Sequence, residues 1–151
     1  MAIYNRWAFR QLYNKLEEHI FDENYRANSG LFFRSIHGTV VHLLLSTNEW
    51  VQAITDRKDL YQPIFIECDR WIDYIKELNL ESLMMEETFP YFDTKGMKIE
   101  RNRAEALDHM FNHNTHHRGQ ITAAITKHGG YDASPVLDLV AMPKDEYNII
   151  N

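Results

Sequence analysis

Four of the eight histidines in this chain lie within nine residues of one another, from His109 to His117. The centre of the cluster reads HNTHHRGQ, from His113 to Gln120. Two residues that are four positions apart lie one above the other on a helix face, with about 6 Å between their Cβ atoms. Imidazoles at this spacing can bind the same metal ion. His113 and His117 are therefore candidate metal ligands.

The apolar residues of the predicted last helix indicate which of these histidines face inward. At about 100° per residue, His117 lies inside the apolar arc and His113 lies at its edge, whereas His109 and His116 point progressively outward. The arc is formed by Leu107, Met110, Phe111, Ile121, Ala124 and Ile125. Neutral imidazoles at a buried face need polar partners, because each nitrogen left unsatisfied costs about 1–3 kcal/mol. A metal ion shared by His113 and His117 would satisfy both rings.

Two histidines make a weak metal site, so a third ligand is expected from another helix, as in metal sites built inside helix bundles. The candidates are His37 and His42 in the second predicted helix and His19 at the end of the first. The apolar pattern slightly favours His37, which borders the dense apolar stripe of its helix. His42 lies on the opposite side, but the small residue Gly38, one turn before it, would leave room for an ion. The helical pattern by itself leaves this choice open.

Apolar residues at helical spacing predict four long helices with irregular connections, over residues 3–20, 32–54, 64–78 and 102–128. Asn102 and Glu105 have the spacing of a capping box at the start of the last helix, and Gly129 with Gly130 supplies a stop at its end. Residues 56–59 and Pro63 are expected to break the pattern between the second and third helices. Turn residues at 93–96 predict a short β-hairpin or an extended crossover before the last helix.

The bulk composition limits the classes of protein that this chain can belong to. A length of 151 residues, of which 44% are hydrophobic and 13% aromatic, fits a single globular domain over residues 1–151. The formal net charge of −6 argues against nucleic acid as a partner, which would need a basic surface. No apolar run approaches the roughly 20 residues of a membrane span. The first residues lack the pattern of a signal peptide, so we expect a cytoplasmic protein.

Several common catalytic motifs are absent from the sequence. It contains no glycine-rich phosphate loop and no G-x-S-x-G nucleophile motif. The His-Glu-x-x-His motif of zinc peptidases is also absent, because Asn114 occupies the position after His113 where glutamate would be needed. The single cysteine, Cys68, lies between Glu67 and Asp69, whose negative charges disfavour a thiolate. We therefore expect Cys68 to be a small, partly buried residue that does not bind the metal.

Three segments of the chain resemble the DinB (damage-inducible) family. They are YNRWA at residues 4–8, SIHGT at 35–39 followed by HLL at 42–44 and by Trp50, and FNHNTHHRGQ at 111–120. The tail around residues 138–139 is similar as well, so the resemblance covers nearly the whole chain. It implies an all-α fold, an up-up-down-down four-helix bundle, that commonly forms a homodimer. The long crossover would come before the last helix.

The resemblance also implies a divalent metal ion held by three histidines. Carried over residue by residue, these ligands are His42, His113 and His117, which places His42 ahead of His37. Many relatives have an acidic residue five positions after the first ligand, whereas this chain has Thr47. The role of that carboxylate therefore does not carry over to this chain.

A three-histidine site with open positions is typical of a metal-dependent enzyme. Some members of the wider superfamily are similar to thiol-dependent transferases, so the expected ligand is a small-molecule substrate or thiol cofactor, with hydrolase-like chemistry as the other option. Nickel or zinc is the expected metal, followed by iron or manganese. No catalytic residue is assigned, although His116, Gln120 and Glu49 are candidates for supporting roles. One alternative is a non-catalytic metal- or ligand-binding stress-response protein, and another is that the histidines only fill polar positions.

Overall fold

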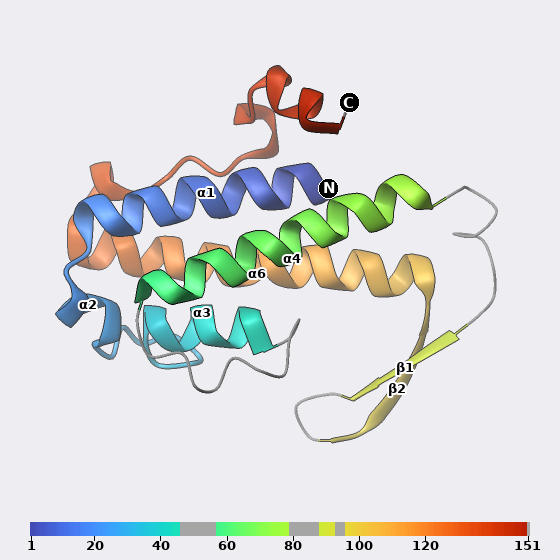
Figure 1. Ribbon diagram of the computed structural model, residues 1–151. Coiled ribbons are helices and arrows are strands. Elements are labelled where there is room, and N and C mark those ends of the chain that lie inside the picture. The colour runs from blue at the N-terminus through green and yellow to red at the C-terminus, as the bar shows by residue number, and fades with distance from the viewer. Residues whose placement is uncertain (46–56, 79–87, 93–95, 151) are drawn as a thin grey trace.

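The computed structural model describes residues 1–45, 57–78, 88–92 and 96–150 and is mostly helical, which confirms the expected all-α fold (Figure 1). The long helices are α1 (Ala2–His19), α3 (Ile36–Leu45), α4 (Arg57–Glu77) and α6 (Arg103–Gly129). The shorter elements are α2 (Asp22–Arg26), β1 (Thr88–Phe92), β2 (Lys98–Asn102) and the 3-10 helices η2 (Tyr131–Ala133), η3 (Leu139–Ala141) and η4 (Lys144–Ile150). Within these described residues, no helix is long and apolar enough to cross a membrane.

Helices α1 and α6 run in one direction, and α3 and α4 run in the other (Figure 1). Near the start of α1, Asn5 bonds to Arg118, and at its end His19 lies against Gly129, so α1 and α6 are parallel. This order is up-down-down-up and differs from the up-up-down-down order that the family resemblance implied. The physical reason is that the connection over residues 20–35, which contains α2, turns the chain back at the end of α1, so that α3 lies antiparallel to α1.

The hydrophobic core has two parts along the bundle axis. The larger part is centred on fully buried residues of all four long helices and of α2, namely Leu12, Leu16, Tyr25, Ile36, Val40, Leu44, Leu60, Ile121 and Ile125. The smaller part joins the start of α1, the end of α4, the start of α6 and the C-terminal segment, through Ile3, Trp7, Ile72, Leu107, Phe111 and Met142. Helix α6 contributes Leu107 and Phe111 to the smaller part and Ile121 and Ile125 to the larger part. Residues 113–117 lie between these two sets.

Helix α6 begins and ends almost where the sequence predicts. The Glu105 backbone N–H donates to Asn102 Oδ1 (2.9 Å), and the Asn102 backbone N–H donates to Glu105 Oε2 (3.4 Å), which confirms the capping box. Gly130 has a φ of 86°, a conformation that glycine adopts readily, and it ends the helix. The expected hairpin is also confirmed, because β1 pairs with β2 in an antiparallel ladder that leads directly into Asn102. Residues 93–95 of its turn lie outside the described residues.

The start of α3 and the start of α4 both differ from the prediction. Helix α3 begins at Ile36 rather than near residue 32, because Arg34 has a φ of 69° and Ser35 Oγ accepts a hydrogen bond from the Gly38 backbone N–H (3.0 Å). Its predicted extension to residue 54 lies outside the described part of the chain. Helix α4 begins at Arg57 and contains Pro63, which was expected to break it. Proline inside a helix costs about 3 kcal/mol, and burial of the flanking Leu60 and Ile64 offsets this cost.

Candidate metal centre

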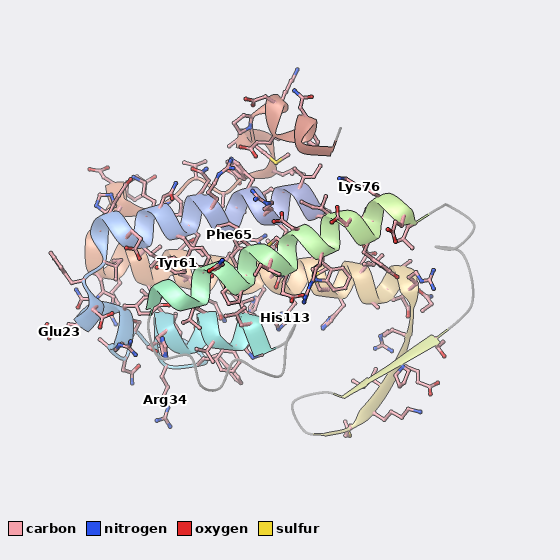
Figure 2. All side chains as sticks on the ribbon, in the orientation of Figure 1. Glu23, Arg34, Tyr61, Phe65, Lys76 and His113 are labelled. Atoms are coloured by element: carbon pink, nitrogen blue, oxygen red, sulfur yellow. The ribbon has the colours of Figure 1, made fainter. Side chains whose placement is uncertain are left out.

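Three histidine side chains meet where the last turn of α3 faces the middle of α6. His113 Nε2 lies 3.1 Å from His42 Nε2 and 3.1 Å from His117 Nε2. One ligand nitrogen from each residue lies within 4.8 Å of the other two. In Figure 2, His113 lies beside the end of α3. The structure therefore brings together the three residues that the family resemblance selected.

The spacing and protonation of these nitrogens fit a shared metal ion. Two imidazole nitrogens bound to one ion at about 2.1 Å are about 3.0–3.4 Å apart when their angle at the ion is between about 90° and about 109°. His117 Nδ1 lies 2.8 Å from Gln120 Oε1, which can only accept, so Nδ1 carries the hydrogen and Nε2 presents a lone pair. A hydrogen on His113 Nε2 can point either at His42 Nε2 or at His117 Nε2, but not at both. A cation would satisfy all three nitrogens at once.

Phe33 forms a wall of this centre that the sequence did not predict. Its ring stacks on His42 with 3.9 Å between centroids and 20° between planes, and it lies 5.5 Å from the His117 ring. A side chain at Gly38 would clash with the backbone oxygen of Phe33. Gly38 therefore makes room for Phe33 rather than for an ion. The only sign of this contact in the sequence is Gly38 itself. That the backbone of Phe33 packs against Gly38 is evident only from the fold.

The other candidate histidines lie away from the centre. His37 faces α2, where its ring packs edge-on against Tyr25 at 5.6 Å, so the slight preference for His37 from the helical pattern is wrong. His19 is exposed beside Lys15 and Glu18. His109 is exposed, with its ring 5.8 Å from that of His113. The physical reason for the error is that α2 covers the face of α3 that carries His37. Thr47, Glu49 and Trp50 lie outside the described residues.

Arg118 links two of the sequence segments that resembled the family. The side chain is only 1% exposed, and its guanidinium donates to Asn5 Oδ1 on α1 and to Thr115 Oγ1 (3.0 Å). It also lies over the rings of Tyr4 and Phe9, at 5.3 and 4.9 Å. These contacts hold α6 against α1. Because successive helical residues are rotated by about 100°, His117 is turned away from α1 and toward α3.

Comparison with known proteins agrees with this geometry. The profile of the DinB family matches residues 1–147. The chain belongs to the DinB family. It is similar to Protein DinB of Bacillus subtilis (strain 168), with 27% identity over an alignment 149 residues long; the alignment covers 87% of this chain and 86% of the relative. No solved structure matches the chain.

In this DinB-family protein, Gln120 orients one of the three imidazoles. It lies one helical turn after His117 and accepts the Nδ1 hydrogen of that ring (2.8 Å), while its own amide nitrogen donates to His116 Nε2 (3.1 Å). A hydrogen bond of this kind fixes both the tautomer and the direction of a metal-binding imidazole. Gln120 is therefore a positioning residue, and His116 is the exposed end of the same chain of hydrogen bonds.

Burial keeps the three imidazoles in the form that binds metal. Together with the neighbouring imidazoles, it lowers the pKa of His42 and of His113 to about 4. Burial also lowers the pKa of His117, although its bond to Gln120 acts in the opposite direction. All three rings are therefore neutral at pH 7. A metal ion would not have to displace protons from them.

The first prediction concerns the pH dependence of metal binding. The lowered pKa values of His42 and His113 mean that protons compete with the metal at these two ligands only as the pH approaches 4. Between pH 7.5 and pH 6.0 we expect the Kd for Zn²⁺ to rise by less than about threefold, measured by competition with a chelating dye. Three imidazoles with the ordinary pKa of about 6.5 would weaken binding about 50-fold over the same interval. A change of that size would contradict the lowered pKa values.

The second prediction concerns Gln120. Gln120→Ala should weaken Zn²⁺ binding by about 10-fold to 100-fold at pH 7.5, because His117 loses the partner that fixes its tautomer. Isothermal titration of the metal into the apoprotein gives the affinity. Gln62→Ala, at an exposed position of α4, is the matched control and should change nothing. Equal affinities for the two variants would show that Gln120 does not position His117.

Proposed function

We propose that this DinB-family protein is a metal-dependent enzyme that activates a small-molecule thiol. His42, His113 and His117 would hold one divalent ion, with nickel or zinc, both of which suit imidazole ligands, as the expected metal. The observation that carries the proposal is the convergence of three neutral imidazoles, with 3.1 Å from His113 Nε2 to each of the other two Nε2 atoms.

The number of protein ligands favours catalysis over a structural role. Structural zinc sites are closed by four protein ligands, whereas catalytic sites have three and leave a position for water or substrate. Among the residues that the structure describes, no fourth histidine, cysteine or carboxylate joins the group. Cys68 is buried and bonded to the Asn5 amide (3.6 Å), and burial raises the pKa of its thiol to about 12. The position left open is therefore available to an external ligand.

The residues around the centre favour a thiol as that ligand. When bound, a divalent ion lowers the pKa of a coordinated thiol or water and polarises a carbonyl. Zinc peptidases place a glutamate base directly after their first histidine, but Asn114 is buried here and donates to Met110 Sδ (3.4 Å), away from the three rings. A thiol that coordinates the ion needs no separate base, because coordination itself favours the thiolate. Phe33 meanwhile keeps water from one face of His42.

The third prediction tests both the metal and its role. Protein purified without a histidine tag should contain one divalent ion per chain by elemental analysis. His113→Ala should lose it, because two imidazoles remain, whereas His19→Ala, at an exposed position of α1, should retain it. If His113→Ala keeps its metal and its affinity, the three histidines only fill polar positions.

Activity is then measured on the metal-loaded protein, with cysteine, glutathione or coenzyme A as the thiol and 1-chloro-2,4-dinitrobenzene as the electrophile. In this reaction the sulfur–carbon bond forms, the carbon–chlorine bond breaks, and chloride and the thiol proton are released. We expect turnover that requires the metal and is lost in His113→Ala. Metal bound at one per chain with no turnover in this assay or in a hydrolase panel would contradict catalysis and leave a metal- or ligand-binding protein.

A further inference from the structure

Two phenylalanines occupy the middle of a tight turn that precedes α3. The Arg34 backbone N–H donates to the Leu31 carbonyl (2.8 Å), and the Ser29 backbone N–H donates to the Arg34 carbonyl (2.7 Å), so the turn is closed twice. Arg34 has a φ of 69°, a conformation that residues other than glycine rarely adopt. Phe32 and Phe33 are therefore held at the tip of the turn, where polar residues and glycine are usual.

The two rings extend the aromatic wall of the three-histidine centre outward. The Phe33 ring covers one face of His42, with 3.9 Å between centroids. The Phe32 ring meets the Phe33 ring edge to face, with 4.9 Å between centroids and 79° between planes. Phe32 itself is 79% exposed, although burial of a phenylalanine side chain is strongly favourable. The turn thus keeps a large apolar side chain in solvent, one ring away from a proposed metal ligand.

The exposed rings around the centre differ in polarity. His113 is partly exposed, so the centre is open to solvent. His109 is exposed, and its ring lies 5.8 Å from that of His113. His116 is exposed as well, and its ring lies 5.0 Å from that of His117. A molecule that enters the centre from solvent would therefore find polar imidazoles and, at the Phe32 ring, an apolar surface.

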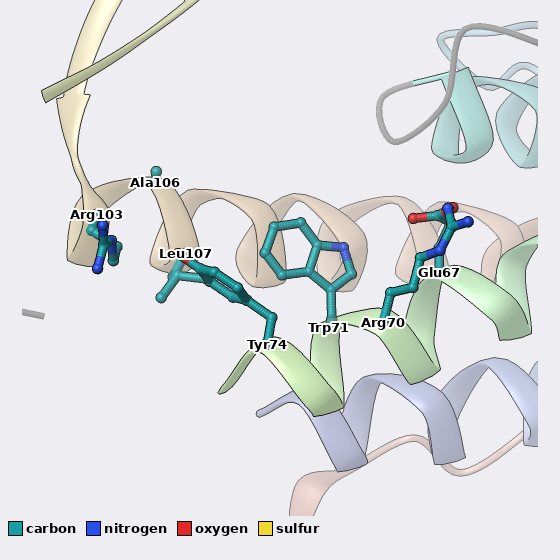
Figure 3. A pocket seen from close by; sticks show the side chains of 7 residues that line it. All are labelled: Glu67, Arg70, Trp71, Tyr74, Arg103, Ala106 and Leu107. Carbon is teal, nitrogen blue, oxygen red and sulfur yellow. The ribbon is translucent and has the colours of Figure 1, made fainter. Parts of the chain in front are cut away.

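A separate apolar slot has no part in this contact. It has a volume of about 350 Å³, lies between α4 and α6, and is lined by Trp71, Tyr74 and Leu107 among others (Figure 3). None of the three histidines is among the described residues that line it. Apolar contact with the three-histidine centre is made instead by Phe33, and Phe32 extends that contact toward solvent.

We propose that Phe32 and Phe33 form a specificity subsite of the three-histidine centre, which takes a flat apolar group of the molecule that binds there. Such a group would bury the ring that the turn holds in solvent, and contact between two rings is favourable beyond the area buried. The pair carries no charge, so the group that it takes is uncharged. The substrate is therefore an organic molecule with an aromatic or alicyclic group next to its reacting atom. This inference rests on the proposed function, in which that molecule is the electrophile that receives the thiol.

The fourth prediction compares benzohydroxamate with acetohydroxamate, which bind zinc through the same pair of oxygen atoms and differ in carrying a phenyl or a methyl group. Both are titrated calorimetrically into the zinc-loaded protein. We expect benzohydroxamate to bind about fivefold more tightly or better, because its ring packs on Phe32. Phe32→Ser should abolish this preference, whereas Phe32→Tyr, which keeps the ring, should retain it. Phe21→Ser, at an equally exposed phenylalanine (80%) before α2, is the matched control and should also retain it.

No binding of either hydroxamate, equal affinities for the two, or a preference that Phe32→Ser leaves unchanged would overturn the subsite. So would binding that competes with self-association of the chain, because Phe32 would then be a contact between copies. Nuclear Overhauser contacts should join the phenyl protons of benzohydroxamate to the Phe32 ring, and contacts to Trp71 and Tyr74 instead would overturn the subsite.

Zinc content is measured for every variant, so that a loss of metal is not mistaken for a loss of the subsite. The preference for benzohydroxamate without any thiol transfer counts against the proposed function alone. Thiol transfer without that preference counts against the subsite alone. Wild-type protein that binds no zinc would overturn both.

Discussion

The contact between the imidazoles of His42, His113 and His117 is the constraint on which the surrounding structure depends. His113 Nε2 lies 3.1 Å from the Nε2 atom of each of the other two neutral rings, and the hydrogens available to the three rings cannot satisfy every nitrogen. Partly buried polar atoms without partners cost about 1–3 kcal/mol each. Such an arrangement is unfavourable for core packing alone and favourable for binding a cation. The helices must therefore hold these rings together against a local energetic cost.

Contacts on both sides of the centre supply that support. Arg118 is a buried cation that has neutral hydrogen-bond partners on α1 and α6 and aromatic rings above it, and it fixes the rotation of α6. On the other side, Gly38 allows the backbone of Phe33 to pack against α3, so that the Phe33 ring lies flat on His42. Gln120 then selects the tautomer of His117. Arg118 acts on the rotation of α6, Phe33 acts on the His42 ring, and Gln120 acts on the His117 ring. Together these contacts restrict the orientations of the three imidazoles.

The parts of this structure that depend on local geometry could be predicted from the sequence. The boundaries of α6 followed from Asn102, Glu105 and Gly130, and the pairing of His113 with His117 followed from four-residue spacing within one helix. The choice between His37 and His42 depends on which face of α3 meets α6, and only the family resemblance favoured His42. The direction of α3 and the helical conformation around Pro63 depend on packing between helices, which periodicity along one chain does not report. The role of Phe33 was missed for the same reason.

X-ray absorption at the zinc edge of the zinc-loaded, untagged protein tests the central claim most directly, because it counts the imidazoles bound to the ion. We expect three imidazole nitrogens at about 2.0–2.1 Å, with oxygen as the remaining ligand and no sulfur. His42→Ala should reduce the imidazole count to two. A native site with two or fewer imidazoles, or with a sulfur ligand at about 2.3 Å from Cys68, would contradict the three-histidine centre.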